Sequence, residues 1–335
     1  MENFFAVAIA GVMVVALILY ALLAGADFGG GIWDLLAIGP RARQQRDALE
    51  HAIGPVWEAN HVWLILVIVL LFSAFPPAFA AIMTAFHIPI TVVLIGIVLR
   101  GSTFVFRKYD AQDDATHRRW SLLFSISSLL TPLFLGMTLG GLATGAVLVE
   151  NDLVVSGFFA GWTTPFALAC GLFAQGLFAF LAATYMTVET TADPQLQNDF
   201  RQRALLSGLS LAPAALLVFL LAQGAAPALF AGLTAWWAPL LLGLTSIAAL
   251  TALFALWQRW FRLARLAAAA QVTLILAGWA LAQYPALVPP AITIQSAAAP
   301  LLTLRLLVIA LAGGALLLLP SLFYLFVVFK QQKKL

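Results

Sequence analysis

Long uncharged apolar runs separated by short polar segments make up almost the whole chain. The first run, Phe4 to Ala24, has twenty-one residues without a charge, enough to cross a hydrocarbon core of about 30 Å as a helix. The runs are solidly apolar rather than alternating, which indicates helices and not a transmembrane barrel. Eight further runs complete a prediction of nine transmembrane helices, near residues 55–75, 78–100, 120–147, 157–187, 204–222, 236–257, 264–283 and 300–329.

Prolines and glycines mark the expected breaks between these helices. Pro76 and Pro77 separate the second run from the third, because consecutive prolines remove backbone donors. We expect the three glycines 29–31 to end the first helix just after Asp27, and residues 283–300 to form an extramembrane loop. The first three residues carry no basic charge and the run is too long for a signal-peptide core, so the first span is expected to be retained. Residues 1–335 are expected to form a single integral membrane domain.

Composition narrows the class of protein further. Hydrophobic residues make up 63% of the chain and charged residues 9%, with a mean hydropathy of +1.01. Soluble domains carry roughly 45–50% apolar and about 25% charged residues, so a soluble globule is excluded. The low charge content also excludes a disordered chain. A single cysteine, Cys170, leaves no disulfide framework and no cysteine-based metal site.

The basic residues are distributed very unevenly among the predicted connections. Sixteen of the seventeen lie on one side of the nine predicted spans, and only Arg305 begins a span from the other side. The positive-inside rule makes the basic side cytoplasmic, with the N-terminus outside and the C-terminus inside. The net charge of +3 is therefore explained by topology, and no nucleic-acid partner is predicted.

Four acidic residues at or near span ends are the main candidates for chemistry, because a charge inside a membrane bundle costs several kcal/mol. They are Asp27 and Asp34 where the first span is expected to leave the membrane, Glu58 in the first turn of the second span, and Glu189 at the end of the fifth.

On the predicted topology Asp27, Glu58 and Arg100 all lie near the cytoplasmic face. His61 follows Glu58 by three residues and Trp57 by four, so these side chains are neighbours on one helix. One interpretation is a proton intake formed by Glu58, His61 and Asn60. The other is that Asp27 or Glu58 pairs with Arg100 and fastens three helix ends together. The residues by themselves leave both open.

The histidines raise the question of a haem or metal ligand. His51 and His117 fall in polar segments that are expected to be solvated connections. His87 is placed inside the third predicted span, where it could bind a metal or hydrogen-bond a neighbouring helix next to Pro89. No nucleotide-binding or zinc-protease motif is present, and no Ser-His-Asp arrangement can be argued.

Several segments resemble subunit II of the cytochrome bd-type quinol oxidases. They run from one end of the chain to the other in the family's order, and the second is quite specific. These segments are Gly-Ala-Asp-Phe-Gly-Gly-Gly at 25–31, Trp-Glu-Ala-Asn-His-Val-Trp at 57–63, Val-Leu-Arg-Gly at 98–101, Ala-Thr-Tyr-Met at 183–186 and the late run from Tyr284 to Pro300.

The resemblance implies an all-α polytopic protein of the bacterial inner membrane, with two four-helix bundles and one peripheral helix. It implies a haem-free subunit of a respiratory complex that oxidises quinol and reduces oxygen to water. Two haems b and one haem d would be held by subunit I, and this chain would bind no metal. Some members carry a structural quinone in this subunit, and a small single-helix subunit is a further candidate partner. The short chain is similar to the cyanide-insensitive branch.

The resemblance also suggests residue roles, with no catalytic residue in this chain. Glu58 matches a proposed point of proton intake, so Glu58, Asp27 and His61 are the predicted proton-transfer residues. Asp27 and Arg100 match positions associated with stability of the haem sites, and Arg100 and Trp57 are assigned a structural, charge-pairing role. Two other classes stay open: a secondary transporter with the acidic cluster as a coupling-ion site, and a purely structural assembly subunit.

Overall fold

The computed structural model describes residues 2–53, 57–109, 114–151 and 153–331, and side chains over the same ranges except 2–3, 107–109, 114–118 and several between 319 and 331. Within these ranges nine helices are long and apolar enough to cross a membrane, as predicted. They are α1 (Glu2–Leu35), α3 (Trp57–Ala74), α5 (His87–Tyr109), α6 (Asp114–Ala143), α7 (Pro165–Glu189), α8 (Pro194–Ala225), α10 (Ala238–Trp257), α11 (Phe261–Gln283) and α12 (Leu301–Gln331).

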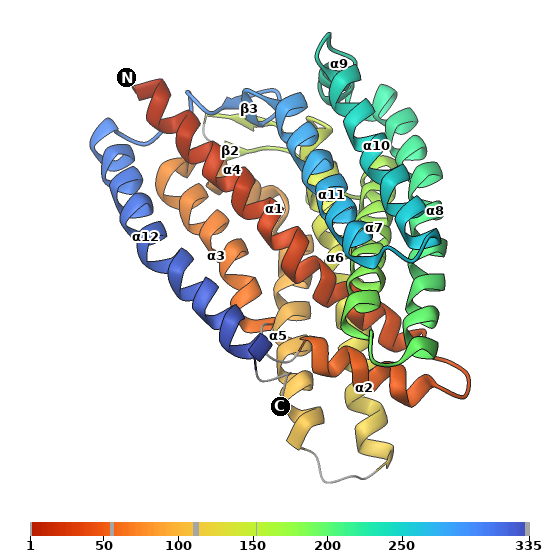
Figure 1. Ribbon diagram of the computed structural model, residues 1–335. Coiled ribbons are helices and arrows are strands. Elements are labelled where there is room, and N and C mark those ends of the chain that lie inside the picture. Colours follow the sequence, from red (N-terminus) through yellow and green to blue (C-terminus); the bar gives the residue numbers. More distant parts are fainter. Residues whose placement is uncertain (1, 54–56, 110–113, 152, 332–335) are drawn as a thin grey trace.

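Shorter elements lie at the ends of these helices (Figure 1). The helices α4 (Pro76–Ala85) and α9 (Pro227–Leu233) lie at the end that holds the N-terminus, and α2 (Ala42–Ile53) lies at the opposite end. Two antiparallel hairpins, β1 (Val149–Glu150) with β2 (Leu153–Val154) and β3 (Ala286–Val288) with β4 (Ile292–Thr293), complete the described structure. The second hairpin occupies the predicted loop 283–300.

The first membrane helix does not end at the glycine run, so that prediction was wrong. Helix α1 continues through Gly29 and Gly31 to Leu35. A Cβ atom on Gly29 would overlap the carbonyl oxygen of Phe178 in α7, and one on Gly31 would overlap the Ser128 side chain in α6. Close approach to two neighbouring helices thus offsets the low helix propensity of glycine, roughly 1 kcal/mol per residue.

Other boundaries also differ from the predicted ones. The break at Pro76 is confirmed, but the predicted third span of 78–100 is divided into α4 and α5. The fifth span begins at Pro165 rather than 157, because Thr164 caps the helix by accepting a hydrogen bond from the Ala167 amide. The sixth extends beyond 204–222 at both ends, to Pro194–Ala225.

The polar segment that contains His51 is helix α2 and not a loop. Its buried residues, Gln45, Leu49 and Ile53, recur at a spacing of four, so one face of an otherwise polar helix packs against the rest of the protein.

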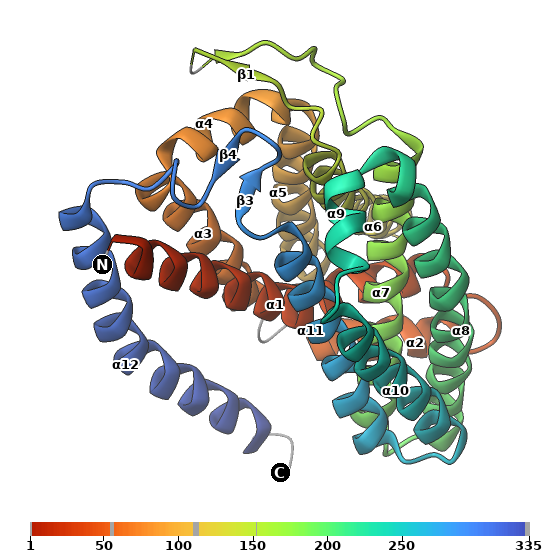
Figure 2. The ribbon, with the colours of Figure 1, turned by 90° about the horizontal axis from the view of Figure 1, so that it is seen from above.

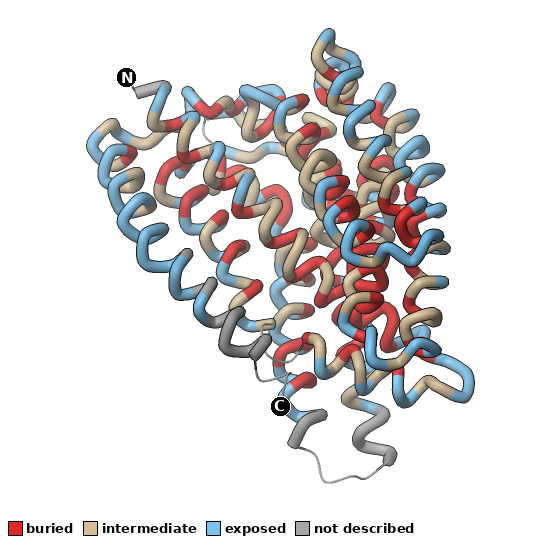
Figure 3. The backbone as a smooth tube through the Cα atoms, viewed as in Figure 1, coloured by how far each residue is buried: buried red, intermediate tan, exposed pale blue. Residues whose placement is uncertain are grey.

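Helix α1 lies at the centre of the packing. It contacts α3, α6, α7, α11 and α12. Many of the buried residues lie along α1 and α7, as the red parts of the tube in Figure 3 show. Seen from above, α12 stands at the periphery (Figure 2), and every residue from Ala312 to Leu318 is exposed. The division of these helices into two four-helix bundles stays a prediction.

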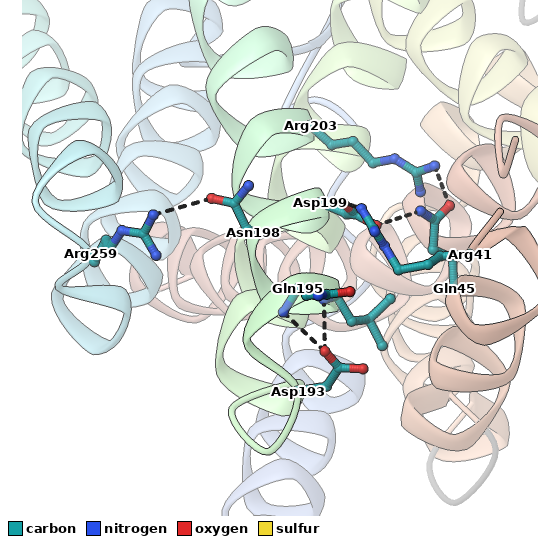
Figure 4. Close-up of polar contacts among 9 residues, drawn as sticks. Arg41, Gln45, Asp193, Gln195, Asn198, Asp199, Arg203 and Arg259 are labelled. Carbon is teal, nitrogen blue, oxygen red and sulfur yellow. Dashed lines mark hydrogen bonds and ion pairs between the residues drawn. The ribbon is translucent and has the colours of Figure 1, made fainter. Parts of the chain in front are cut away.

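A polar network fastens α2 to the start of α8 (Figure 4). Arg41 donates from Nε and Nη2 to the Asp199 carboxylate at 2.8 and 2.5 Å, and Gln45 donates to the same carboxylate at 2.9 Å. Arg203 donates to the Gln45 side-chain oxygen at 2.7 Å. The hydrogen bond and charge of Asp199 raise the pKa of Arg41, which therefore stays positive.

Basic residues from distant segments thus gather at the α2 end, where Arg259 also approaches Asn198 of α8 at 3.4 Å (Figure 4). The gathering agrees with the uneven charge pattern of the sequence.

Candidate functional site

A buried carboxylate–amide pair joins α1 to α3. Asn60 donates from Nδ2 to Asp27 Oδ2 at 2.6 Å, and the two residues are 3% and 6% exposed. Asp27 lies about two turns before Leu35, inside α1 and not at its end as the glycine run suggested. A carboxylate in such a place costs free energy unless hydrogen bonds or an opposite charge stabilise it.

Arg100 of α5 lies beside this pair and is 2% exposed. Its Nε donates to Ser128 Oγ of α6 at 3.1 Å, and its guanidinium carbon lies 4.9 and 5.1 Å from the ring centres of Phe28 and Phe124. These distances allow cation–π attraction to both rings.

The direct ion pair that the sequence suggested is not formed: within the described ranges, no ion pair within 4.0 Å joins Arg100 to Asp27 or Glu58. Arg100 and Asp27 still act on each other electrostatically. The Arg100 guanidinium instead bonds to Ser128 and lies against two aromatic rings. Its positive charge therefore stabilises the Asp27 carboxylate without a direct contact.

His61 lies between the buried pair and the surface. Its ring centre is 5.8 Å from those of Tyr20 and Phe28 and 6.5 Å from that of Trp57, which confirms the predicted contact four residues apart. Trp57 packs against Phe104, with ring centres 5.9 Å apart; its structural role stays a prediction.

A groove of about 540 Å³ opens between α3 and α5. Its walls are mostly apolar, and its polar lining comes from Glu58, His61 and Ser102. Glu58 is exposed there, in the first turn of α3 as predicted. The structure therefore brings Glu58 and His61 together in the groove, and Asn60 of the same helix donates to Asp27.

Residues 5–329 match the family model described as cytochrome bd terminal oxidase subunit II. The chain belongs to this family. Together with the nine apolar helices, family membership makes it a multi-pass protein of the bacterial inner membrane.

Individual relatives share moderate identity with this subunit II chain. Cytochrome bd-I ubiquinol oxidase subunit 2 of Escherichia coli is 28% identical over 55% of this chain and 48% of its own length. The cytochrome bd ubiquinol oxidase subunit 2 of Bacillus subtilis is 29% identical over 55% and 53%. The matches thus span about half the length of these curated relatives. A bd oxidase structure from Geobacillus thermodenitrificans, 23% identical, shares the fold with a TM-score of 0.81 over 97% of this chain and 98% of that one.

The remaining candidates of this bd-family chain lie apart from the groove. Asp34 is buried in α1 and accepts a hydrogen bond from Ser125 at 3.1 Å, and Glu189 at the end of α7 is 3.4 Å from Arg265. His87 is the exposed first residue of α5 and bonds to the Thr84 carbonyl oxygen at 2.9 Å. His87 is therefore the first residue of a span, and not in the middle of one as predicted, because Phe86 separates α4 from α5.

No group of three or more His, Cys, Asp or Glu side chains gathers anywhere in the described part of this subunit II chain. His51 is exposed on α2, and the side chain of His117 lies outside the described residues.

Sequence reasoning missed Tyr20, Phe28, Phe124 and Ser128, which surround Asp27, His61 and Arg100. One signal was available, because Tyr20 is the one side chain between Phe4 and Ala24 that carries a hydrogen-bonding group. Phe28 lies within the motif at 25–31, whereas Phe124 and Ser128 gave no signal, since such residues are common in apolar helices.

Proposed function

We propose that this chain is the haem-free subunit of a quinol:oxygen oxidoreductase, which supports a haem-bearing subunit I and delivers cytoplasmic protons for the reduction of oxygen to water. Family membership supports the oxidase complex, and the relatives from Escherichia coli and Bacillus subtilis are named as subunits of ubiquinol oxidases. The haems b and d, held by the partner subunit, supply the redox chemistry, while this chain's residues hold and move protons.

The placement of Glu58, His61 and Asp27 is the observation that carries the proposal. Glu58 is an exposed carboxylate in a groove, His61 lines the same groove, and Asp27 is a buried carboxylate beside the Phe28 ring that His61 contacts. A proton taken up at Glu58 can pass to the His61 imidazole and then towards Asp27. Carboxylates and imidazoles are the groups that form such relays inside membranes.

The position of the groove supports uptake from the cytoplasm. Trp57 and Glu58 begin α3 at the end of the molecule that carries α2 and the basic network (Figure 1). Under the positive-inside rule this end faces the cytoplasm, with the N-terminus outside.

Glu58→Gln tests the proposal, because glutamine keeps the size of the side chain and cannot carry a proton as an acid. We expect the complex to assemble with normal haem absorbance and to reduce oxygen at least about tenfold more slowly. Oxygen uptake with a reduced quinol measures the rate. Glu150→Gln is the matched control and should leave the rate unchanged, since Glu150 is an exposed acid in β1, which pairs with β2 at the opposite end of the molecule (Figure 1).

Normal oxygen uptake in Glu58→Gln would remove this residue from the proton route. Loss of the haem spectra would instead support a structural assembly role for the chain. Purification in mild detergent addresses the transporter alternative, because a secondary transporter would be isolated in working form without a haem-bearing partner.

A further inference from the structure

Three buried polar atoms on α1, α3 and α5 lack a protein hydrogen-bond partner within the described ranges. They are the Tyr20 hydroxyl, His61 Nδ1 and Arg100 Nη2. Buried donors and acceptors are nearly always paired, with protein groups or with ordered water. Three such atoms on neighbouring side chains point to small buried ligands that hydrogen-bond to them.

The three groups are linked to one another through contacts with two aromatic rings, those of His61 and Phe28. The Tyr20 and His61 ring centres are 5.8 Å apart, and Arg100 lies over the Phe28 ring that also contacts His61. The charges of Arg100 and Asp27 both act on the Tyr20 hydroxyl. Because Tyr20 precedes Asp27 by seven residues, the two side chains lie on one face of α1, roughly 10 Å apart along its axis.

The polar groups on this face of α1 end at Tyr20. Farther from Asp27, the buried residues of α1 are Ala16, Met13, Ile9 and Ala6, which offer no hydrogen-bonding side chain. Tyr20 is itself 3% exposed and lies near the middle of the helix. A polar region that begins near the groove therefore stops at about half the depth of the membrane helix.

We propose that Tyr20, His61 and Arg100 bind a small cluster of buried water molecules, which links the Glu58 groove to the Asp27 side and ends at the Tyr20 hydroxyl. Water fits because it can accept from the arginine, donate to or accept from the imidazole, and do both with the phenol. A buried water needs two to four such partners. The binding of water at this place is independent of the proposed function. The role of the water in proton delivery, with Tyr20 as a positioning residue, rests on the proposed function.

An electron-microscopy map of the assembled oxidase that resolves ordered water tests the binding site directly. We expect density within about 3.2 Å of the Tyr20 hydroxyl, His61 Nδ1 and Arg100 Nη2. Tyr20→Phe removes only the hydroxyl and keeps the ring against His61, so the water nearest to position 20 should be lost. Absence of density beside all three atoms, or an unchanged water pattern in Tyr20→Phe, would overturn the proposed site.

Turnover of the same variant tests the positioning role. With normal haem spectra, Tyr20→Phe should slow oxygen reduction on the order of fivefold, as expected for one lost hydrogen bond, and should raise the solvent deuterium isotope effect. Tyr185→Phe is the matched control: it is a half-buried tyrosine in α7, stacked by Arg265 and away from this cluster, and should change neither quantity. Unchanged turnover and isotope effect in Tyr20→Phe would overturn the positioning role.

The two proposals fail differently. Ordered water beside Tyr20 that is lost in Tyr20→Phe, combined with normal turnover in Glu58→Gln, supports the water site and overturns proton delivery through the groove. Slow turnover in Glu58→Gln, combined with no water at the three atoms, supports proton delivery and overturns the water site.

Discussion

Arg100→Gln is expected to prevent assembly of the complex. The substitution removes a buried positive charge that compensates Asp27, and it also removes the contacts with the Phe28 and Phe124 rings. Leaving a buried charge without its opposite typically costs about 3–5 kcal/mol, a large fraction of the stability of a membrane bundle. The yield of complex in mild detergent and its haem absorbance measure the loss.

A second substitution separates charge from packing. Asp27→Asn keeps an acceptor for Asn60 but removes the negative charge, so the double variant Arg100→Gln, Asp27→Asn should assemble better than Arg100→Gln alone. Arg119→Gln, at an exposed arginine of α6, is the matched control and should assemble normally. A double variant no better than the single one would contradict compensation between Arg100 and Asp27.

Gly29→Ala has the second largest expected effect. Alanine favours an isolated helix by roughly 1 kcal/mol over glycine, yet here its Cβ would overlap the Phe178 carbonyl oxygen on α7. Because a backbone atom cannot move aside as a flexible side chain can, α1 and α7 must separate. We expect destabilisation of about 1–3 kcal/mol or more, measured as a lower thermal unfolding midpoint of the purified complex.

Gly11→Ala, on the same helix, is not expected to destabilise the complex. No heavy atom of the described residues lies within 4 Å of the Cβ that alanine would add there, so the change should be neutral or slightly stabilising. Equal midpoints for Gly29→Ala and the wild type would show that α1 and α7 do not depend on close approach at this position.

Much of the fold follows from local properties of the chain. Nine helices, the break at Pro76 and the concentration of basic residues at one end depend on the length of apolar runs, on proline and on the distribution of charge. The placement of Glu58 and His61 on one helix end depends only on their spacing of three residues, and the structure confirms that both line the same groove.

The amino-acid sequence by itself therefore determined the class of fold, the number of spans and the family. Only the tertiary structure decided that Gly29 and Gly31 continue α1, that Arg100 bonds to Ser128 instead of a carboxylate, and that Tyr20 lies beside His61. The physical reason is that apolar length and charge act along the chain, whereas close packing and hydrogen-bond partners depend on which helices become neighbours. Those neighbours come from distant segments of the chain, as α1 and α7 do at Gly29 and Phe178.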